Sequence, residues 1–431
     1  MKLHIQGGRL VNPATGEDRV ADVFIDQGGI VAFDQAPDAF VADQTIDAKG
    51  LLVLPGLVDL SARLREPGYE HRATLESELN AALAGGVTSI VLPPDTDPVL
   101  DEPGLVEMLK HRARQMHQSH VYPLGAMTRN LQGKVITEMA ELTEAGCVAF
   151  SQAEVQLEDA SVLLRCMQYA RSFDYTLWLR PQDPYLSKGG VAASGPYASR
   201  LGLSGIPVQA ETIALHTIFE LQRSARVRLH LCRLSSAAGL ELVRQAKKEG
   251  LPVTCDVSMN HVHLTDLDIG YFDSNYRFAP PLRSQRDREA IWQGLLDGTI
   301  DAICSDHTPV DDDDKLLPFA EAEPGSTGLE LLLSLAIKWS QEQAVPLAEA
   351  LAKVTANPAA ILGAAVPASC GKLYVGADAD LCLVDAEQYW TPTPEGLKSQ
   401  GKHSPFIGME LPGRVKMTIV EGRVAYTDTL I

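Results

Sequence analysis

The chain has 431 residues, 45% of them hydrophobic, and it carries 56 acidic against 37 basic residues for a formal net charge of -19. So acidic a surface repels phosphate backbones and anionic headgroups, which argues against a nucleic-acid or membrane role. The 7 cysteines form no CxxC pair, and the sequence shows neither a signal peptide nor an apolar run of membrane-spanning length. We therefore expect a cytoplasmic protein with reduced thiols.

Short apolar runs punctuated by turn residues predict β-strands at both ends of the chain. Near the N-terminus, Gly7-Gly8 interrupts the apolar pattern and predicts a break between two short strands. Strand character returns after residue 379 and continues to Tyr426. We expect residues 1–54 and 360–431 to pair into one small β domain.

Between these ends, apolar strand-like runs alternate with segments of helical periodicity. Predicted strands lie at 88–92, 121–124, 147–150, 176–179, 226–232, 253–257 and 302–304, and predicted helices at 105–116, 139–144, 162–172, 239–249 and 287–296. Alternation of this kind indicates a parallel sheet with crossover helices. The repeated units number about eight, which predicts an α/β fold with a (β/α)8 TIM-type barrel over residues 55–359. The charge run Asp311–Asp314 is expected to be a solvated loop.

Eight short segments, spread through most of the chain, resemble the dihydroorotase branch of the amidohydrolase superfamily. They are LPGLVD (54–59), LREPGY (64–69), AGGVT (84–88), GAMT (125–128), APPLRS (279–284), DGTIDAI (297–303), SDHTP (305–309) and TANPA (355–359). The resemblance implies an amidohydrolase barrel. In active relatives, zinc held by imidazole and carboxylate ligands at the barrel mouth activates water and polarises an amide.

The resemblance breaks at the positions that would hold the metal. The family pattern Asp-x-His-x-His-x-Arg corresponds to residues 59–65, where Ser61 and Arg63 replace both histidines. Gln152 replaces the bridging carboxylate or lysine, and Arg180 and Arg233 replace the remaining histidines. The last-strand aspartate survives as Asp306, so five of the six positions implied by the family have changed.

Arginine cannot take the place of a metal ligand, because its guanidinium group offers no lone pair and stays protonated. Arg65 survives at the family position for the substrate carboxylate, whereas Asp95 puts an anion where an anionic substrate should bind. We therefore predict no catalytic, metal-binding or substrate-binding residue and no cofactor. The degenerate former site comprises Ser61, Arg63, Arg65, Asp95, Gln152, Arg180, Arg233 and Asp306.

An unpaired Asp306 at the barrel mouth would be costly to bury. We therefore expect it to form a salt bridge with at least one of Arg63, Arg180 and Arg233. Counted with Arg65 against Asp306 and Asp95, the former site keeps a net positive charge, which leaves a bound anion as an alternative to a purely structural cluster.

Two functional roles are possible for the histidines outside the former site. His261 and His263 would share one face of a strand and could bind a relocated zinc together with Asp306. His307 could act as an acid or base, although the resemblance implies a structural histidine there.

The resemblance extends to an inactive class of dihydroorotase-like chains that associate with aspartate carbamoyltransferase in pyrimidine biosynthesis. It implies a non-catalytic assembly subunit, a homodimer by itself, that joins the transferase's catalytic chain in a complex of probable six-plus-six composition. Two alternatives are a residual metal-dependent cyclic amidohydrolase of the dihydroorotase or hydantoinase kind, and a sensor that binds an anionic metabolite through the arginine cluster.

Overall fold

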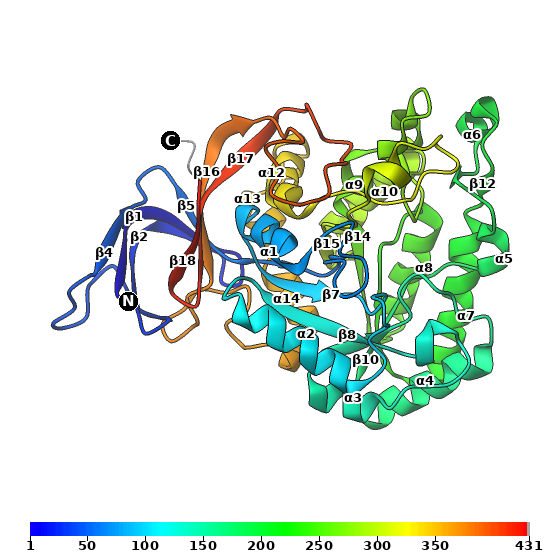
Figure 1. The fold of residues 1–431 in the computed structure, drawn as a ribbon, viewed down its shortest axis with the longest axis horizontal. Coiled ribbons are helices and arrows are strands. Elements are labelled where there is room, and N and C mark those ends of the chain that lie inside the picture. The colour runs from blue at the N-terminus through cyan, green and yellow to red at the C-terminus, as the bar shows by residue number, and fades with distance from the viewer. Residues whose placement is uncertain (429–431) are drawn as a thin grey trace.

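Strands from the two chain ends form one mixed sheet in the computed structural model, which describes residues 1–428. The N-terminal strands are β1 (Leu3–Asn12), β2 (Glu17–Asp26), β3 (Gly29–Phe33), β4 (Gln44–Asp47) and β5 (Leu52–Pro55), and the C-terminal strands are β16 (Leu381–Trp390), β17 (Leu411–Val420) and β18 (Arg423–Thr427). The order is β18-β17-β16-β5-β1-β2-β3, with β4 beside β1. The antiparallel pairing of β5 with β16 joins the two ends, so the predicted terminal β domain is confirmed (Figure 1).

The expected strand break at Gly7-Gly8 is wrong. β1 runs through both glycines, and its register with β2 shifts between Ile5 and Gly8. Gly7 has a φ of +68°, a conformation that suits glycine, so the pair produces a β-bulge inside one strand.

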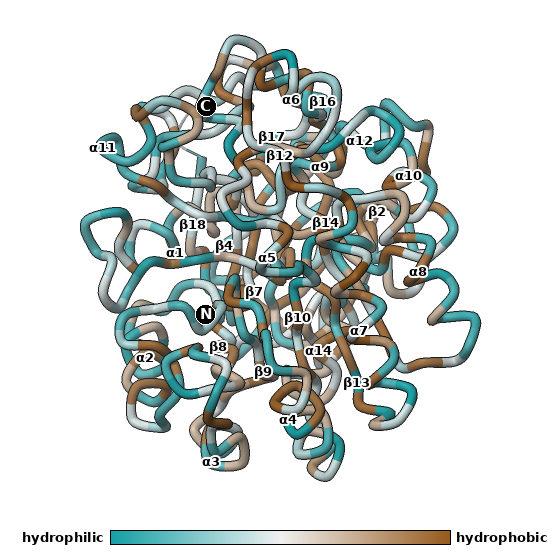
Figure 2. Tube along the Cα trace, turned by 90° about the vertical axis from the view of Figure 1, so that its right-hand side faces the viewer, coloured by the Kyte–Doolittle hydropathy of each residue, from teal (hydrophilic) through white to brown (hydrophobic). Residues whose placement is uncertain are grey.

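Eight parallel strands form the barrel, as predicted. They are β6 (Leu57–Asp59), β7 (Val87–Leu92), β8 (His120–Ala126), β9 (Ala149–Ser151), β10 (Thr176–Leu179), β13 (Arg228–Leu231), β14 (Val253–Ser258) and β15 (Ala302–Cys304). The larger helices are α1 (Leu75–Ala84), α2 (Pro103–Gln115), α3 (Met139–Ala145), α4 (Ala160–Ser172), α7 (Gln209–Ala225), α8 (Ala237–Lys248), α10 (Gln285–Leu296) and α12 (Leu332–Glu342). Figure 2 shows hydrophobic strands at the centre, with α2, α3, α4, α7 and α8 around them. Within residues 1–428, no helix combines the length and the apolar character needed to cross a membrane.

Short elements occupy the connections between the barrel strands and helices. They are η1 (Arg129–Leu131), α5 (Pro184–Ser187), β11 (Ala192–Ala193), α6 (Pro196–Leu201), β12 (Gly205–Ile206), α9 (Met259–His263), η2 (Asp266–Ile269), η3 (Ser274–Tyr276), α11 (Asp312–Lys315), η4 (Leu329–Leu331), α13 (Leu347–Ala352), α14 (Ala356–Leu362) and η5 (Gly363–Ala365). The pair β11 and β12 forms a small separate sheet.

Side chains complete the seam between the first and last barrel strands. The ladder of the sheet ends at β6 and β15, where Ser305 donates its backbone N–H to Asp59 Oδ1 at 2.9 Å and its hydroxyl to Asp59 Oδ2. An isolated bridge between Ala62 and His307 continues the seam. Burial raises the pKa of the Asp59 carboxyl to about 6, although the hydrogen bonds from Ser305 oppose this shift.

The predicted domain boundary at residue 360 falls inside α14. Ala359, Leu362, Val366 and Cys370 pack in one buried cluster with residues of the barrel strands, among them Trp178. The chain from α14 to Cys370 therefore packs against the barrel before it returns to the β domain. The predicted β-domain range ends at residue 431, and residues 429–431 lie outside the described part of the chain.

The run Asp311–Asp314 is partly solvated, as expected, since Asp312 and Asp313 are exposed, but most of it belongs to the short helix α11 and not to a loop. Asp311 caps the short helix α11 by accepting from the N–H of Asp314. Asp314 pairs with Arg72 at 2.6 Å, and Asp312 pairs with His403 at 2.8 Å. Local capping and distant cations therefore order this charge run, which its composition alone could not indicate.

Gly56 lies where the chain passes from β5 of the small domain into β6 of the barrel. A Cβ placed there would lie 2.1 Å from Oγ1 of the buried Thr88. We expect Gly56→Ala to lower the free energy of unfolding by about 1–3 kcal/mol through overpacking, measured by urea denaturation. Gly104→Ala is the matched control, because Gly104 lies in α2 with open space around it. Equal midpoints for both variants would contradict this account.

Candidate functional site

Five barrel strands bring charged side chains to one place at the barrel mouth. Arg63 follows β6, Glu154 follows β9, Arg180 follows β10, Arg233 follows β13 and Asp306 follows β15. All five come from the carboxyl-terminal ends of parallel strands, where barrel enzymes assemble their active sites. The side chains of the three arginines and of Asp306 are almost completely buried.

Glu154 lies at the centre of this cluster and contacts all three arginines. Its Oε1 accepts a hydrogen bond from Arg63 Nη2 at 2.9 Å and another from Arg233 Nη2. Its Oε2 lies 2.5 Å from Arg180 Nε. The sequence analysis missed Glu154. Two features could have indicated it, namely its place just beyond a predicted barrel strand and the need of three buried arginines for an anion.

The expected salt bridge of Asp306 is confirmed. Arg233 Nη1 lies 3.0 Å from Asp306 Oδ1, and Arg63 Nε donates to Asp95 Oδ2 at 2.8 Å. With Arg65 included, four arginines face the three carboxylates of Asp95, Glu154 and Asp306. The net charge of the mouth is therefore one positive unit, which is smaller than a count without Glu154 suggests.

The charges of the cluster hold one another ionised. Burial raises the pKa of Glu154, but the guanidinium groups of Arg180, Arg233 and Arg63 bring it well below its ordinary value. Asp306 behaves differently, because burial raises its pKa above the ordinary range despite the neighbouring arginines. The donor set does not fit a metal. Guanidinium groups offer no lone pair, and their fixed charges oppose a divalent cation.

Arg65 differs from the other three arginines in having no carboxylate within ion-pair distance among the described residues. Its Nε donates to the carbonyl of Pro309 at 2.9 Å, while Nη2 has no hydrogen-bond partner. Burial and the charge of Arg63 lower its pKa to about 10. Arg65 lines a cavity of about 140 Å³ together with Arg63 and Arg233, and the carboxylates of Asp95, Glu154, Asp306 and Glu323 line it as well. One guanidinium donor of this cavity is therefore unpaired, but acidic groups surround it.

Ser61 and Gln152 take no part in the ion pairs. The Gln152 amide group donates to Thr128 Oγ1 and to the carbonyl of Leu131, both at 2.8 Å. Ser61 lies at the barrel seam, where its carbonyl accepts from the Ser305 hydroxyl at 3.4 Å. The structure therefore brings together six of the eight residues of the predicted former site.

The backbone of the mouth is strained at several strand ends. Arg65, Ala153, Arg233 and Asp306 have φ values of +62°, +49°, +53° and +54°. A non-glycine residue in this region costs roughly 1–3 kcal/mol and persists where its surroundings hold it. For Arg233, the surroundings include Asp256, whose Oδ1 accepts the Arg233 backbone N–H at 2.6 Å.

The histidine pair proposed for a relocated zinc lies on α9, and the strand assignment was wrong. Residues two apart on a helix point in nearly opposite directions, so His261 and His263 share no face. His261 Nε2 lies 3.2 Å from the carbonyl oxygen of Pro281, and His263 Nε2 lies 3.0 Å from that of Leu335. The two rings therefore make separate contacts with the backbone.

His307 is held by both ring nitrogens. Nε2 lies 2.6 Å from Glu78 Oε2, and Nδ1 accepts the N–H of Gly328 at 3.0 Å. Burial raises the pKa of Glu78, but its hydrogen bonds with His307, Ser399 and Ser77 bring it below the ordinary value. The contacts of this buried pair connect the barrel to Ser399, whose hydroxyl donates to Glu78 at 2.7 Å. These contacts indicate a structural histidine.

A second group of potential metal ligands lies beneath the arginines. Among residues 1–428, ligand atoms of His230, Cys232 and Asp256 lie within 4.8 Å of one another. His230 already faces Thr254 Oγ1 through Nδ1 and Asp256 Oδ2 through Nε2, both at 2.9 Å. Burial raises the pKa of Cys232 well above its ordinary value, which disfavours the thiolate that a metal requires. We interpret the group as a satisfied hydrogen-bond network.

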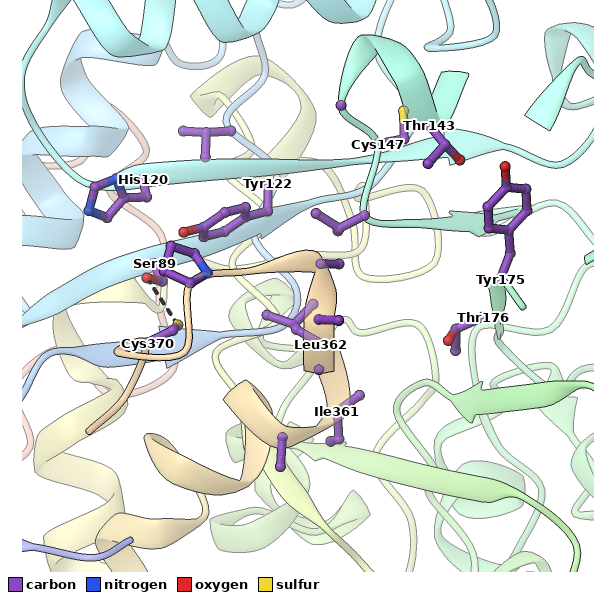
Figure 3. A pocket seen from close by; sticks show the side chains of 18 of the residues that line it. Ser89, His120, Tyr122, Thr143, Cys147, Tyr175, Thr176, Ile361, Leu362 and Cys370 are labelled. Atoms are coloured by element: carbon purple, nitrogen blue, oxygen red, sulfur yellow. Dashed lines mark hydrogen bonds between the residues drawn. The ribbon is translucent and has the colours of Figure 1, made fainter. Parts of the chain in front are cut away.

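A further cavity lies at the opposite end of the barrel. It has a volume of about 1280 Å³ and is lined by the first residues of β8 and β10 and by α14 and η5. Figure 3 shows Tyr175, which precedes β10, and Leu362 of α14 on its walls, with Ser89 and Cys370 joined by a hydrogen bond of 3.6 Å. His120 Nε2 lies 2.9 Å from Asp380 Oδ2. None of the charged residues of the mouth lines this cavity.

Replacing the central carboxylate should destabilise the barrel. Glu154→Gln leaves three buried guanidinium groups without their shared anion. Breaking a buried ion pair costs about 3–5 kcal/mol, and we expect a loss near the lower limit because the Glu154 side chain is 33% exposed. Urea denaturation at pH 7 measures this loss. Glu158→Gln is the control, since Glu158 contacts Tyr185 outside the cluster. A cost below about 0.5 kcal/mol, within the usual range of surface substitutions, would contradict a central role for Glu154.

The pH dependence of stability should also identify Glu154. Its folded pKa lies below the ordinary value of 4.5, so its contribution is present above pH 4.5 and is lost as the pH falls through the folded pKa. We expect the free energy of unfolding of the unmodified chain to fall below pH 4.5 more steeply than that of Glu154→Gln. Parallel curves in urea titrations between pH 3 and 7 would contradict this assignment.

Comparison with known proteins identifies the family of this chain. The family described as "Dihydro-orotase-like" matches residues 50–238, and the "Amidohydrolase family" matches residues 212–425. A "Dihydroorotase-like protein" of Pseudomonas aeruginosa is 45% identical over 99% of this chain and 100% of its own length. A "Dihydroorotase" of Syntrophus aciditrophicus is 38% identical over 99% of this chain and 100% of its own.

A solved structure agrees with these sequence relatives. The L-hydantoinase (dihydropyrimidinase) of Arthrobacter aurescens superposes with a TM-score of 0.88 at 25% identity, covering 100% of this chain and 97% of its own. The eight-stranded barrel, the two-ended β domain and the full-length sequence matches lead to one conclusion: the chain belongs to the dihydroorotase-like family of the amidohydrolase superfamily.

Proposed function

We propose that this chain is a non-catalytic member of its family and serves as an assembly subunit of aspartate carbamoyltransferase in the pyrimidine biosynthesis of the cytoplasm. The observation that carries the proposal is the contact of Glu154 with Arg63, Arg180 and Arg233. These arginines replace metal-binding histidines of the family. Their ion pairs with Glu154 occupy the barrel mouth with groups that cannot bind a cation.

The chemistry of hydrolysis argues in the same direction. In metal-dependent amide hydrolysis, the metal lowers the pKa of its bound water and polarises the amide carbonyl, so that the water attacks at neutral pH. The mouth instead offers ionised guanidinium groups and a carboxylate, Glu154, that is held in its ionised state by them. A carboxylate with so low a pKa is a poor base. The surviving Asp306 is paired with Arg233.

The rest of the fold supports a structural role for the intact barrel and β domain. The seam of the barrel, the buried pair of His307 with Glu78 and the composite β domain are all built from specific contacts. A protein that keeps this framework without a metal centre presents its outer surface as the functional part. The proposed complex contains six copies of each chain, built on homodimers of this chain and using closed symmetry.

Co-expression with the aspartate carbamoyltransferase of the same host tests the proposal. We expect one large complex, zinc below one tenth of an equivalent per copy of this chain, no hydrolysis of dihydroorotate, and transferase activity that falls when this chain is omitted. Size-exclusion chromatography with light scattering, metal analysis and assays of both activities provide the measurements. Stoichiometric zinc with dihydroorotate turnover by this chain alone would support the residual amidohydrolase instead.

A second candidate function rests on Arg65. Its unpartnered Nη2 is a free donor for an anionic metabolite, whereas the carboxylates that line the adjoining cavity of about 140 Å³ oppose such a ligand. If the site binds carbamoyl aspartate or orotate, a concentration one hundredfold above the Kd should stabilise the fold by about 2.7 kcal/mol. We expect the resulting rise in melting temperature to disappear in Arg65→Gln and to persist in Arg112→Gln, a change outside the cavity. No rise at millimolar ligand would reject the sensor.

A further inference from the structure

Two neighbouring loops at the barrel mouth expose large apolar side chains to solvent. One loop contains η2 and η3, and the other begins at α11. Their exposed residues, defined here as the apolar patch, are Leu267, Tyr271, Phe272, Leu316 and Leu317. Tyr271 is 93% exposed and Leu316 is 74% exposed. Exposed apolar side chains that gather in one region commonly mark an interaction site.

The two loops form one platform, because their inner residues pack together. Ile269 of the first loop and Phe319 of the second belong to one buried cluster. The Arg277 guanidinium lies 6.0 Å from the centre of the Phe319 ring. Within the second loop, the buried Lys315 donates to the carbonyl of Gly325 at 2.6 Å. The apolar patch therefore lies on two loops whose inner residues pack together.

The two loops that carry the apolar patch also expose acidic side chains, one of which, Asp312, pairs with His403. The exposed carboxylates of the two loops, defined here as the acidic rim, belong to Asp268, Asp273, Asp312, Asp313 and Glu321. The cations of the platform face inward, since Lys315 is buried and Arg277 donates to the carbonyl of Val191 at 3.0 Å. The outer surface of the two loops thus combines exposed apolar side chains with exposed carboxylates.

We propose that the apolar patch and its acidic rim form the docking surface for a different protein chain, one that presents an apolar pocket edged by lysine and arginine. Charge complementarity decides between the occupants. A two-fold contact between two copies would place each acidic rim against another acidic rim, and like charges oppose such a contact. A basic partner neutralises the rim while its pocket covers Tyr271, a residue type enriched among interface hot spots.

This inference rests on the proposed function, because the partner tested is the aspartate carbamoyltransferase of the same host. The double variant Tyr271→Ser/Leu316→Ser removes the two most exposed side chains of the apolar patch. Val20→Ser/Val41→Ser is the matched control, since these exposed residues belong to the terminal β domain. Urea midpoints equal to that of the unmodified chain establish that both variants fold.

We expect Tyr271→Ser/Leu316→Ser to raise the Kd of the complex at least tenfold and Val20→Ser/Val41→Ser to leave it unchanged, as measured by sedimentation velocity. Raising the salt concentration from about 50 to 300 mM should weaken the complex of the unmodified chain, since salt screens the contacts of the acidic rim. An unchanged Kd of the double variant overturns the inference alone. Dissociation of the isolated chain's own dimer in that variant, with an intact complex, assigns the patch to self-association and also overturns it. Failure of the unmodified chain to form any complex overturns both proposals.

Discussion

The ion pairs around Glu154 are the contact on which the mouth of the barrel depends. Three guanidinium groups reach this point from the ends of β6, β10 and β13, and all are nearly excluded from water. Burying such charges costs several kcal/mol each unless an anion offsets the cost. Glu154 contacts all three at once, and Asp306 and Asp95 add further pairs. Without these carboxylates, the strand ends could not keep their present arrangement.

Guanidinium groups can fill the electrostatic role of a metal without its chemistry. A catalytic zinc neutralises carboxylates, orders the strand ends and activates water. The arginines of this chain neutralise Glu154 and Asp306 and form ion pairs between segments that follow different strands. They offer no open coordination position. Our proposal of an assembly subunit follows from this difference. In this proposal, the interior of the mouth supplies stability, and the outer loops at the same face supply the surface for a partner.

Much of this architecture follows from local sequence features. Alternating strand and helix patterns indicated the barrel, because hydrophobic periodicity is a property of each segment by itself. The identities of Arg63, Arg180 and Arg233 excluded a family-type metal centre at once, since a guanidinium group cannot ligate zinc in any fold. The pairing of Asp306 was also predictable, because a carboxylate at the mouth required a cation.

The tertiary structure alone decided which groups meet. The barrel, the composite β domain and the absence of metal-ligating groups at Arg63, Arg180 and Arg233 follow from the amino-acid sequence, because they depend on residue type and periodicity. The position of Glu154 beyond β9 could be read from the sequence, but its contact with all three arginines depends on how the strand ends converge. His261 and His263 lost their shared face because the chain turns into α9 after β14. Clusters built from distant segments, such as the one that contains Ile269 and Phe319, likewise arise only when the strands place the loops side by side.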